Sequence, residues 1–201
     1  MEQPIIQTKD YTVFESDEST LWALSEFVVT ENYLHHTNGD DYYMKNTTKM
    51  ISNIYTEERN LYNNSRILIV RNNKGEIIGS IRSTLWDRQT LLPLEKLFGI
   101  NPLDLEFSKH VSSFWHIGRF AINREGSRYS KSILKTLISA ITEPVRNEPN
   151  GCIIAEVDKK LYNSLGTLGI TAHQIAPSIQ YLASETIPIY SKSSELSVRY
   201  S

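Results

Sequence analysis

The chain has 201 residues, of which 40% are hydrophobic and 22% are charged, and its formal net charge at pH 7 is -2. This composition allows a sizeable core and gives no sign of general nucleic-acid binding. The single cysteine, Cys152, excludes an internal disulfide and is typical of a reducing compartment. There is neither a run of about 20 apolar residues for a membrane span nor the start of a signal peptide. We therefore expect one cytoplasmic domain over residues 1–201.

Hydrophobic periodicity and turn residues predict the elements of the first half of the chain. They are, in order, a strand at 11–15, a helix capped by Ser16 or Asp17 that runs to about Leu34, a helix from about Thr47, and strands at 66–71 and 76–85. The turn Asn72-Asn73-Lys74-Gly75 between the last two strands is the strongest hairpin signal in the sequence. A long connection over 86–113 follows, with room for a helical turn at 94–98.

The second half of the chain is organised around residues 115–134. An apolar strand, 115–122, leads through a polar turn containing Gly126 into a helix that starts at about 127–130. Such an arrangement points backbone N–H groups outward at the helix N-terminus, where a phosphate or another anion can bind. The remaining expected features are an end of this helix at Pro144 and Pro149-Asn150-Gly151, a buried strand at 152–157, a helix capped by Asp158 and stopped by Gly169, and strands near 170–176 and 187–191.

Four local patterns occur in an order that resembles one enzyme superfamily. They are Gly79-Ser80-Ile81-Arg82, Leu92-Pro93-Leu94-Glu95, Gly118-Arg119-Phe120-Ala121-Ile122, and Leu168-Gly169-Ile170 followed by 176–181 and 187–190. With these patterns and its element order, nearly the whole chain resembles the GNAT acyltransferases, in particular the N-acyl amino acid synthases and acyl-homoserine-lactone (autoinducer) synthases. The resemblance implies an α+β fold with three αβα layers, in which helices flank a mixed, mostly antiparallel sheet.

The sequence departs from this branch at several positions. His116 stands where related enzymes usually have a glutamate, three residues before Arg119. Gly126 is the only glycine in the region of the phosphate loop of coenzyme-A-dependent members. Leu165 replaces a tyrosine of the last helix, although Tyr162 lies one turn earlier. The N-terminal signature of autoinducer synthases is not recognisable, so acyl transfer to another amine is favoured over homoserine-lactone synthesis.

Acyl transfer from a thioester to an amine needs a base for the amine proton and a group that stabilises the developing thiolate or oxyanion. Histidine suits the first task near neutral pH, so His116 is a catalytic candidate together with Arg119 and Tyr162. The alternative for His116 is a strand histidine satisfied by a neighbouring hydrogen bond. Arg119 lies in an otherwise apolar strand, and an unpaired buried guanidinium would cost several kcal/mol. We expect a carboxylate partner, either from a substrate or from the protein, for example Glu156; Arg82 has the same two interpretations.

The resemblance implies that the strand–turn–helix element binds the acyl donor. The expected donor-binding residues are Phe120, Ala121, Ile122, Arg124, Gly126, Ser127, Arg128, Ser130 and Lys131. Positions 128, 131 and 135 share one helix face, which predicts contacts with the phosphate of a phosphopantetheine arm and with an acidic acyl carrier protein. A solvated basic face is the alternative. The expected donor is acyl-CoA or acyl-acyl-carrier-protein, with no tightly bound cofactor and no metal ion.

Aromatic residues of the N-terminal helices, among them Trp22 and Phe27, are candidates for an acyl-chain pocket. The alternative for these aromatic residues is an ordinary core. Arg82 is a candidate for substrate binding. The leading function is transfer of an acyl group from a phosphopantetheine thioester to the amine of an amino-acid-like acceptor. A second is acetyl-CoA-dependent N-acetylation of a small molecule. A third is a catalytically silent GNAT-like module that binds an acyl carrier or a protein partner.

Overall fold

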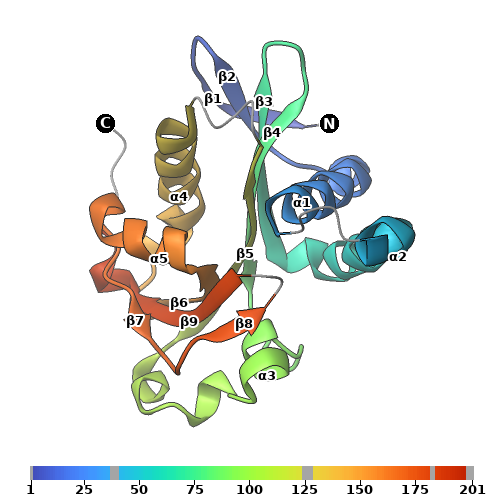
Figure 1. Cartoon of the computed structure of the whole chain (residues 1–201). Helices are drawn as coiled ribbons and strands as arrows, with labels where there is room; N and C mark the ends of the chain where they lie inside the picture. Colours follow the sequence, from blue (N-terminus) through green and yellow to red (C-terminus); the bar gives the residue numbers. More distant parts are fainter. Residues whose placement is uncertain (1, 37–40, 124–128, 182–183, 198–201) are drawn as a thin grey trace. The chain divides into compact units, whose positions relative to one another are not determined.

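The computed structural model describes residues 2–36, 41–123, 129–181 and 184–197, with side chains for these ranges except 32–36 and 41–45 (Figure 1). The chain divides into two compact units. The first combines Met1–Arg82 with Arg119–Leu137, and the second combines Ser83–Gly118 with Ile138–Ser201. That both belong to one domain stays a prediction.

The described strands and helices follow the expected order with additions at both ends. The strands are β1 (Gln3–Gln7), β2 (Tyr11–Glu15), β3 (Ser65–Asn72), β4 (Ile77–Leu85), β5 (Ser113–Ile122), β6 (Gly151–Asp158), β7 (His173–Gln174), β8 (Ile179–Tyr181) and β9 (Ser184–Lys192). The α-helices are α1 (Leu21–His36), α2 (Asp41–Leu61), α3 (Pro93–Phe98), α4 (Ser130–Arg146) and α5 (Lys159–Leu165). None of the helices in the described ranges is long and apolar enough to span a bilayer.

Strands β4 and β5 contribute residues to both units. The strand order is β1-β2-β3-β4-β5 in the first unit and β4-β5-β6-β9-β7 in the second, where β8 also pairs with β9. Strands β5 and β6 are parallel, whereas β1–β2, β2–β3, β6–β9, β7–β9 and β8–β9 are antiparallel. A mixed, mostly antiparallel sheet with flanking helices confirms the predicted α+β class.

In the first unit, helices pack on both faces of the sheet because side chains alternate along β3. Ile67 and Ile69 form a core cluster with Leu21, Leu24 and Val28 of α1. Val70 points to the other face, where a side chain at position 79 of β4 would meet both Val70 and Ile133 of α4. The absence of a side chain at Gly79 therefore lets α4 lie close to the sheet.

The core of the second unit lies under the long connection between β4 and β5. Phe114 of β5 and Cys152 and Ile154 of β6 form a buried cluster with three residues of that connection, Trp86, Leu92 and Leu94. The rings of Trp86 and Phe114 meet edge to face, with centroids 5.8 Å apart. Helix α3 confirms the helical turn expected near residues 94–98.

Local signals placed several elements correctly. Gly75 has a left-handed φ of 85°, as the predicted hairpin turn requires. Asp17, one of the two caps expected before α1, accepts a hydrogen bond from the backbone N–H of Ser19 in the short 3-10 turn that leads into the helix. The predicted cap Asp158 accepts a hydrogen bond from the backbone N–H of Leu161 at the start of α5. Both caps satisfy N–H groups that have no partner within the helix.

Three features of the elements differ from the expectation. Helix α2 begins at Asp41, six residues before Thr47; an acidic residue is typical of a first helical turn, and the polar composition around it hid this signal. Of the two breaks expected at the end of this helix, Pro144 lies inside α4, which continues to Arg146 with Val145 fully buried and ends before Pro149. Strand β1 was not expected, because a register shift next to Pro4 interrupts its alternation.

The close approach at Gly79 can be tested by substitution. A Cβ there would lie 3.2 Å from Cγ2 of Ile133 and 3.3 Å from Cγ2 of Val70. We expect Gly79→Val to lower the free energy of unfolding by about 1–3 kcal/mol through overpacking, measured by urea denaturation. Gly166→Val is the control, since a Cβ there meets nothing within 4 Å. Equal losses in the two variants would contradict the packing explanation.

Candidate functional site

A buried ion cluster joins α2 to β4 and β5 in the first unit. Nη1 of Arg82 donates to Oε1 of Glu58 at 2.5 Å, and Nε of Arg119 donates to the same oxygen at 2.6 Å. The side chains of Arg82 and Glu58 are only 2% and 0% exposed. Nη2 of Arg119 also lies 2.9 Å from Oε2 of Glu57, which is 38% exposed. Two carboxylates therefore balance two guanidinium groups.

The backbone at Arg119 has an uncommon conformation for a strand residue. Its φ is 55°, in the left-handed region that side chains other than glycine rarely adopt. The hydroxyl of Ser80 on β4 donates a 2.8 Å hydrogen bond to the carbonyl oxygen of Arg119. This bond and the ion pairs with α2 hold the residue in a conformation of the kind that occurs often at functional sites.

Burial and the neighbouring carboxylates act in opposite directions on the two arginines. Burial is the largest influence on Arg82 and lowers its pKa, although the carboxylate of Glu58 opposes this effect. Burial also acts to lower the pKa of Arg119, but the carboxylates of Glu58 and Glu57 outweigh it, so that this pKa is raised. Both groups remain charged, because a guanidinium is not deprotonated in proteins.

The carboxylate partner expected for Arg119 is present, but it is not Glu156. Arg119 pairs with Glu57 and Glu58 of α2, whereas Glu156 pairs with His116. Strand order alone suggests Glu156, but the contact between α2 and β5 that supplies the partners joins residues 61 positions apart. Contact of Arg82 and Arg119 with a substrate stays a prediction.

A second buried pair lies in the other unit. Nε2 of His116 on β5 lies 2.9 Å from Oε2 of Glu156 on β6, and the two side chains are 4% and 8% exposed. His116 is opposite Ile154 in the parallel register, so Glu156, two residues further along β6, points to the same face. An ionised carboxylate can only accept a hydrogen bond, so this geometry favours the tautomer with the hydrogen on Nε2.

The described donor-binding candidates lie on β5 and at the start of α4. Ala121 is buried, Phe120, Ile122 and Ser130 are half-buried, and Lys131 is exposed. Arg124, Gly126, Ser127 and Arg128 lie outside the described residues.

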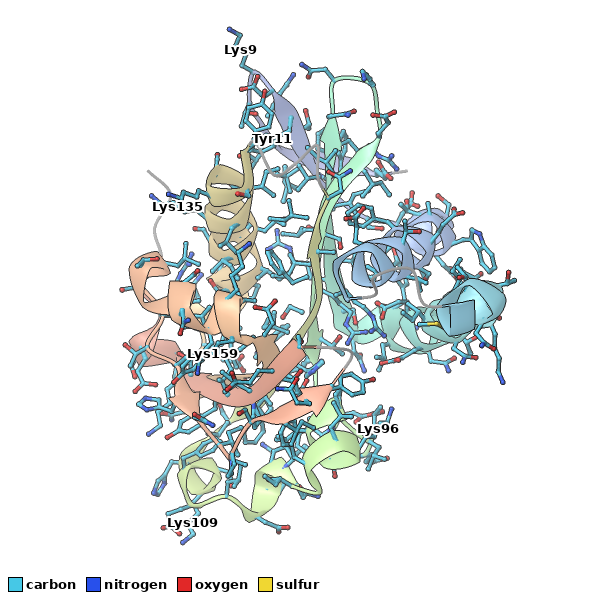
Figure 2. The ribbon with its side chains drawn as sticks, viewed as in Figure 1. Lys9, Tyr11, Lys96, Lys109, Lys135 and Lys159 are labelled. Carbon is cyan, nitrogen blue, oxygen red and sulfur yellow. The ribbon has the colours of Figure 1, made fainter. Side chains whose placement is uncertain are left out.

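The first turns of α4 are attached to β2 by hydroxyl groups. The hydroxyl of Tyr11 lies 2.7 Å from Oγ of Ser132, and the hydroxyl of Tyr129 donates to Oδ1 of Asp10 at 3.2 Å. Figure 2 labels Tyr11 on β2 and Lys135 on α4. These bonds fix the position of the helix start on which the predicted donor site depends.

The remaining candidates are not brought together by any described contact. Tyr162 on α5 is half-buried. Trp22 is 46% exposed and packs edge to face on Tyr55, with centroids 5.4 Å apart. Phe27 packs against the α1 core cluster. Cys152 is fully buried, and burial raises the pKa of its thiol to about 12, which opposes a nucleophilic role.

Comparison with solved structures identifies the fold. FeeM, an N-acyl amino acid synthase from uncultured soil microbes, matches with a TM-score of 0.59 and 11% identity over 92% of this chain and 94% of its own. An acetyltransferase from Corynebacterium glutamicum related to histone acetyltransferase HPA2 matches with a TM-score of 0.58 and 15% identity, over 91% of this chain and 96% of its own. The AHL synthase LasI matches with a TM-score of 0.56 and 12% identity, over 95% of this chain and 96% of its own.

These likenesses confirm the predicted GNAT fold. No protein-family model and no curated protein matches the sequence. At these identities the likeness establishes the fold, and the reaction is a separate question.

The shared carboxylate of Glu58 leads to a prediction about the free energy of unfolding. Glu58→Gln leaves two guanidinium groups without their common buried counter-charge, and we expect it to lower the free energy of unfolding by about 3–5 kcal/mol. The neighbouring Glu57→Gln should cost less than about 1 kcal/mol, because that pair is partly exposed. Urea denaturation of both variants measures the difference. Similar losses would show that Glu58 has no special role.

Proposed function

We propose that the chain is an N-acyltransferase that moves an acyl group from a phosphopantetheine thioester to the amine of an amino-acid-like acceptor. The observation that carries this proposal is the GNAT fold, which the chain shares over most of its length with an N-acyl amino acid synthase and an AHL synthase. The donor is a coenzyme A thioester or an acylated carrier protein. No tightly bound cofactor is needed for this reaction.

The reaction is a direct attack of the amine on the thioester carbonyl. His116 takes a proton from the amine, the C–N bond forms, and the C–S bond breaks. The thiolate leaves and is protonated, and Tyr162 is the proposed acid for this step. In the first unit, Arg119 and Arg82 are the proposed acceptor-binding residues, and Trp22 and Phe27 are the proposed acyl-chain contacts.

The start of α4 is the proposed contact for the donor. Ser130 offers a hydroxyl and Lys131 a positive charge near the helix N-terminus, where backbone N–H groups favour a phosphate. An acidic carrier protein would meet the same basic residues.

The likeness to an acetyltransferase supports a second candidate, acetyl-CoA-dependent N-acetylation of a small molecule. The two candidates differ in the acyl group and in the carrier. Both require a base at the reacting amine.

The proposal is tested by incubating the purified protein with acetyl-CoA, long-chain acyl-CoA or acylated carrier protein and a mixture of amino acids. Mass spectrometry of the products and release of free thiol measure the reaction. We expect N-acyl amino acids from the long-chain donors, and a fall in rate of about 100-fold or more in His116→Gln, because general bases contribute on this scale.

His173→Gln is the matched control, since His173 also pairs with a glutamate, Glu195, but is 40% exposed. Its rate should stay within about twofold of wild type. Turnover of acetyl-CoA alone would favour the second candidate. No turnover with any donor by the folded protein would leave a binding module.

The basic residue Lys131 at the start of α4 leads to a separate prediction about carrier-protein binding. Lys131→Glu should weaken binding of an acidic carrier protein about fivefold at low salt, or about 1 kcal/mol, and less at high salt because of screening. Lys49→Glu, at another exposed lysine, on α2, is the control. Isothermal titration calorimetry at two salt concentrations measures both, and equal effects would contradict the assignment.

A further inference from the structure

We infer that Glu156 is a positioning residue for the proposed reaction. It holds the imidazole of His116 in one orientation and stabilises the imidazolium that forms when His116 takes the proton of the amine. This inference rests on the proposed function, and it concerns a residue that the sequence pattern linked to Arg119 instead.

The geometry of the pair is set by regular structure. His116 and Glu156 lie on adjacent parallel strands, and the register places His116 opposite Ile154. The carboxylate reaches Nε2 at 2.9 Å from the diagonal position on the same face. Since both side chains are more than nine-tenths buried, neighbouring atoms restrict their rotation.

The second oxygen of Glu156 distinguishes this pair from the pair of His173 and Glu195. Oε1 of Glu156 is buried and has no hydrogen-bond partner among the described residues. In the other histidine–glutamate pair of this unit, Glu195 accepts from His173 through Oε1 and from the backbone N–H of Lys192 through Oε2. Both oxygens of that carboxylate therefore accept a hydrogen bond.

A buried carboxylate with few hydrogen bonds gains most from a positive charge beside it. The imidazolium supplies that charge at the moment when His116 accepts a proton. Because Nε2–H faces the carboxylate, the neutral ring presents Nδ1 as its acceptor nitrogen. Tyr162 gives a proton to the thiolate, and His116 holds the proton that it took from the amine. Exchange with solvent then moves a proton from His116 back to Tyr162. Amine and thioester thereby become amide and thiol without an added reactant.

The test compares steady-state kinetics of Glu156→Gln with wild type. We expect kcat to fall about 100-fold or more and KM to change less than about threefold, because the charge acts after binding. Glu156→Asp keeps the charge and should have an intermediate kcat. Glu195→Gln is the matched control, and its kcat should stay within about twofold of wild type.

Nitrogen-15 NMR of the His116 imidazole provides a readout that does not depend on activity. Wild type should show the tautomer with hydrogen on Nε2, and Glu156→Gln should change this signal while leaving that of His173 unchanged. An active wild type with an unchanged Glu156→Gln rate, or an unchanged His116 signal, would overturn the inference. A wild type that is inactive with every donor would instead overturn the proposed function and remove the reaction that Glu156 serves.

Discussion

The sharing of one buried carboxylate by two guanidinium groups is the constraint on which the first unit depends. Glu58 has no exposed surface, and its Oε1 lies within hydrogen-bond distance of both Arg82 and Arg119. A shift of α2 relative to β4 or β5 would leave a buried charge unpaired, which is costly in a low-dielectric interior. A purely apolar contact would tolerate a small shift of α2 better than this ion cluster does. The ion cluster therefore specifies where α2 packs.

The second unit uses a buried charge differently. Glu156 has one bond to an imidazole and one oxygen without a partner among the described residues. Glu195, the carboxylate of the more exposed histidine pair, accepts a hydrogen bond through each of its two oxygens. Poorly satisfied buried groups are uncommon in native structures, and a catalytic role is one explanation for them.

Local rules predicted much of the fold, because turns, caps and periodicity depend on neighbouring residues. Gly75 and Asp158 are examples. The polar residues of the site were also visible, since His116 and Arg119 interrupt an apolar strand. Their partners were not, because strand register and helix packing join distant segments. One signal was available: Glu58 follows Ile54 by four residues on the apolar stripe of α2, which indicates a buried carboxylate in need of a cation.

The buried His116–Glu156 pair and the left-handed backbone at Arg119 bear on the choice between an enzyme and a silent module. A module that only binds a carrier needs the fold and a basic surface, and neither requires a histidine paired with an under-satisfied glutamate inside the sheet. The left-handed backbone at Arg119 and the Glu156 oxygen that no described residue contacts by a hydrogen bond both lower stability. A protein can keep such features at a functional site at a cost in stability. Their occurrence on and beside β5, the strand that carries His116 and Arg119, favours the enzyme.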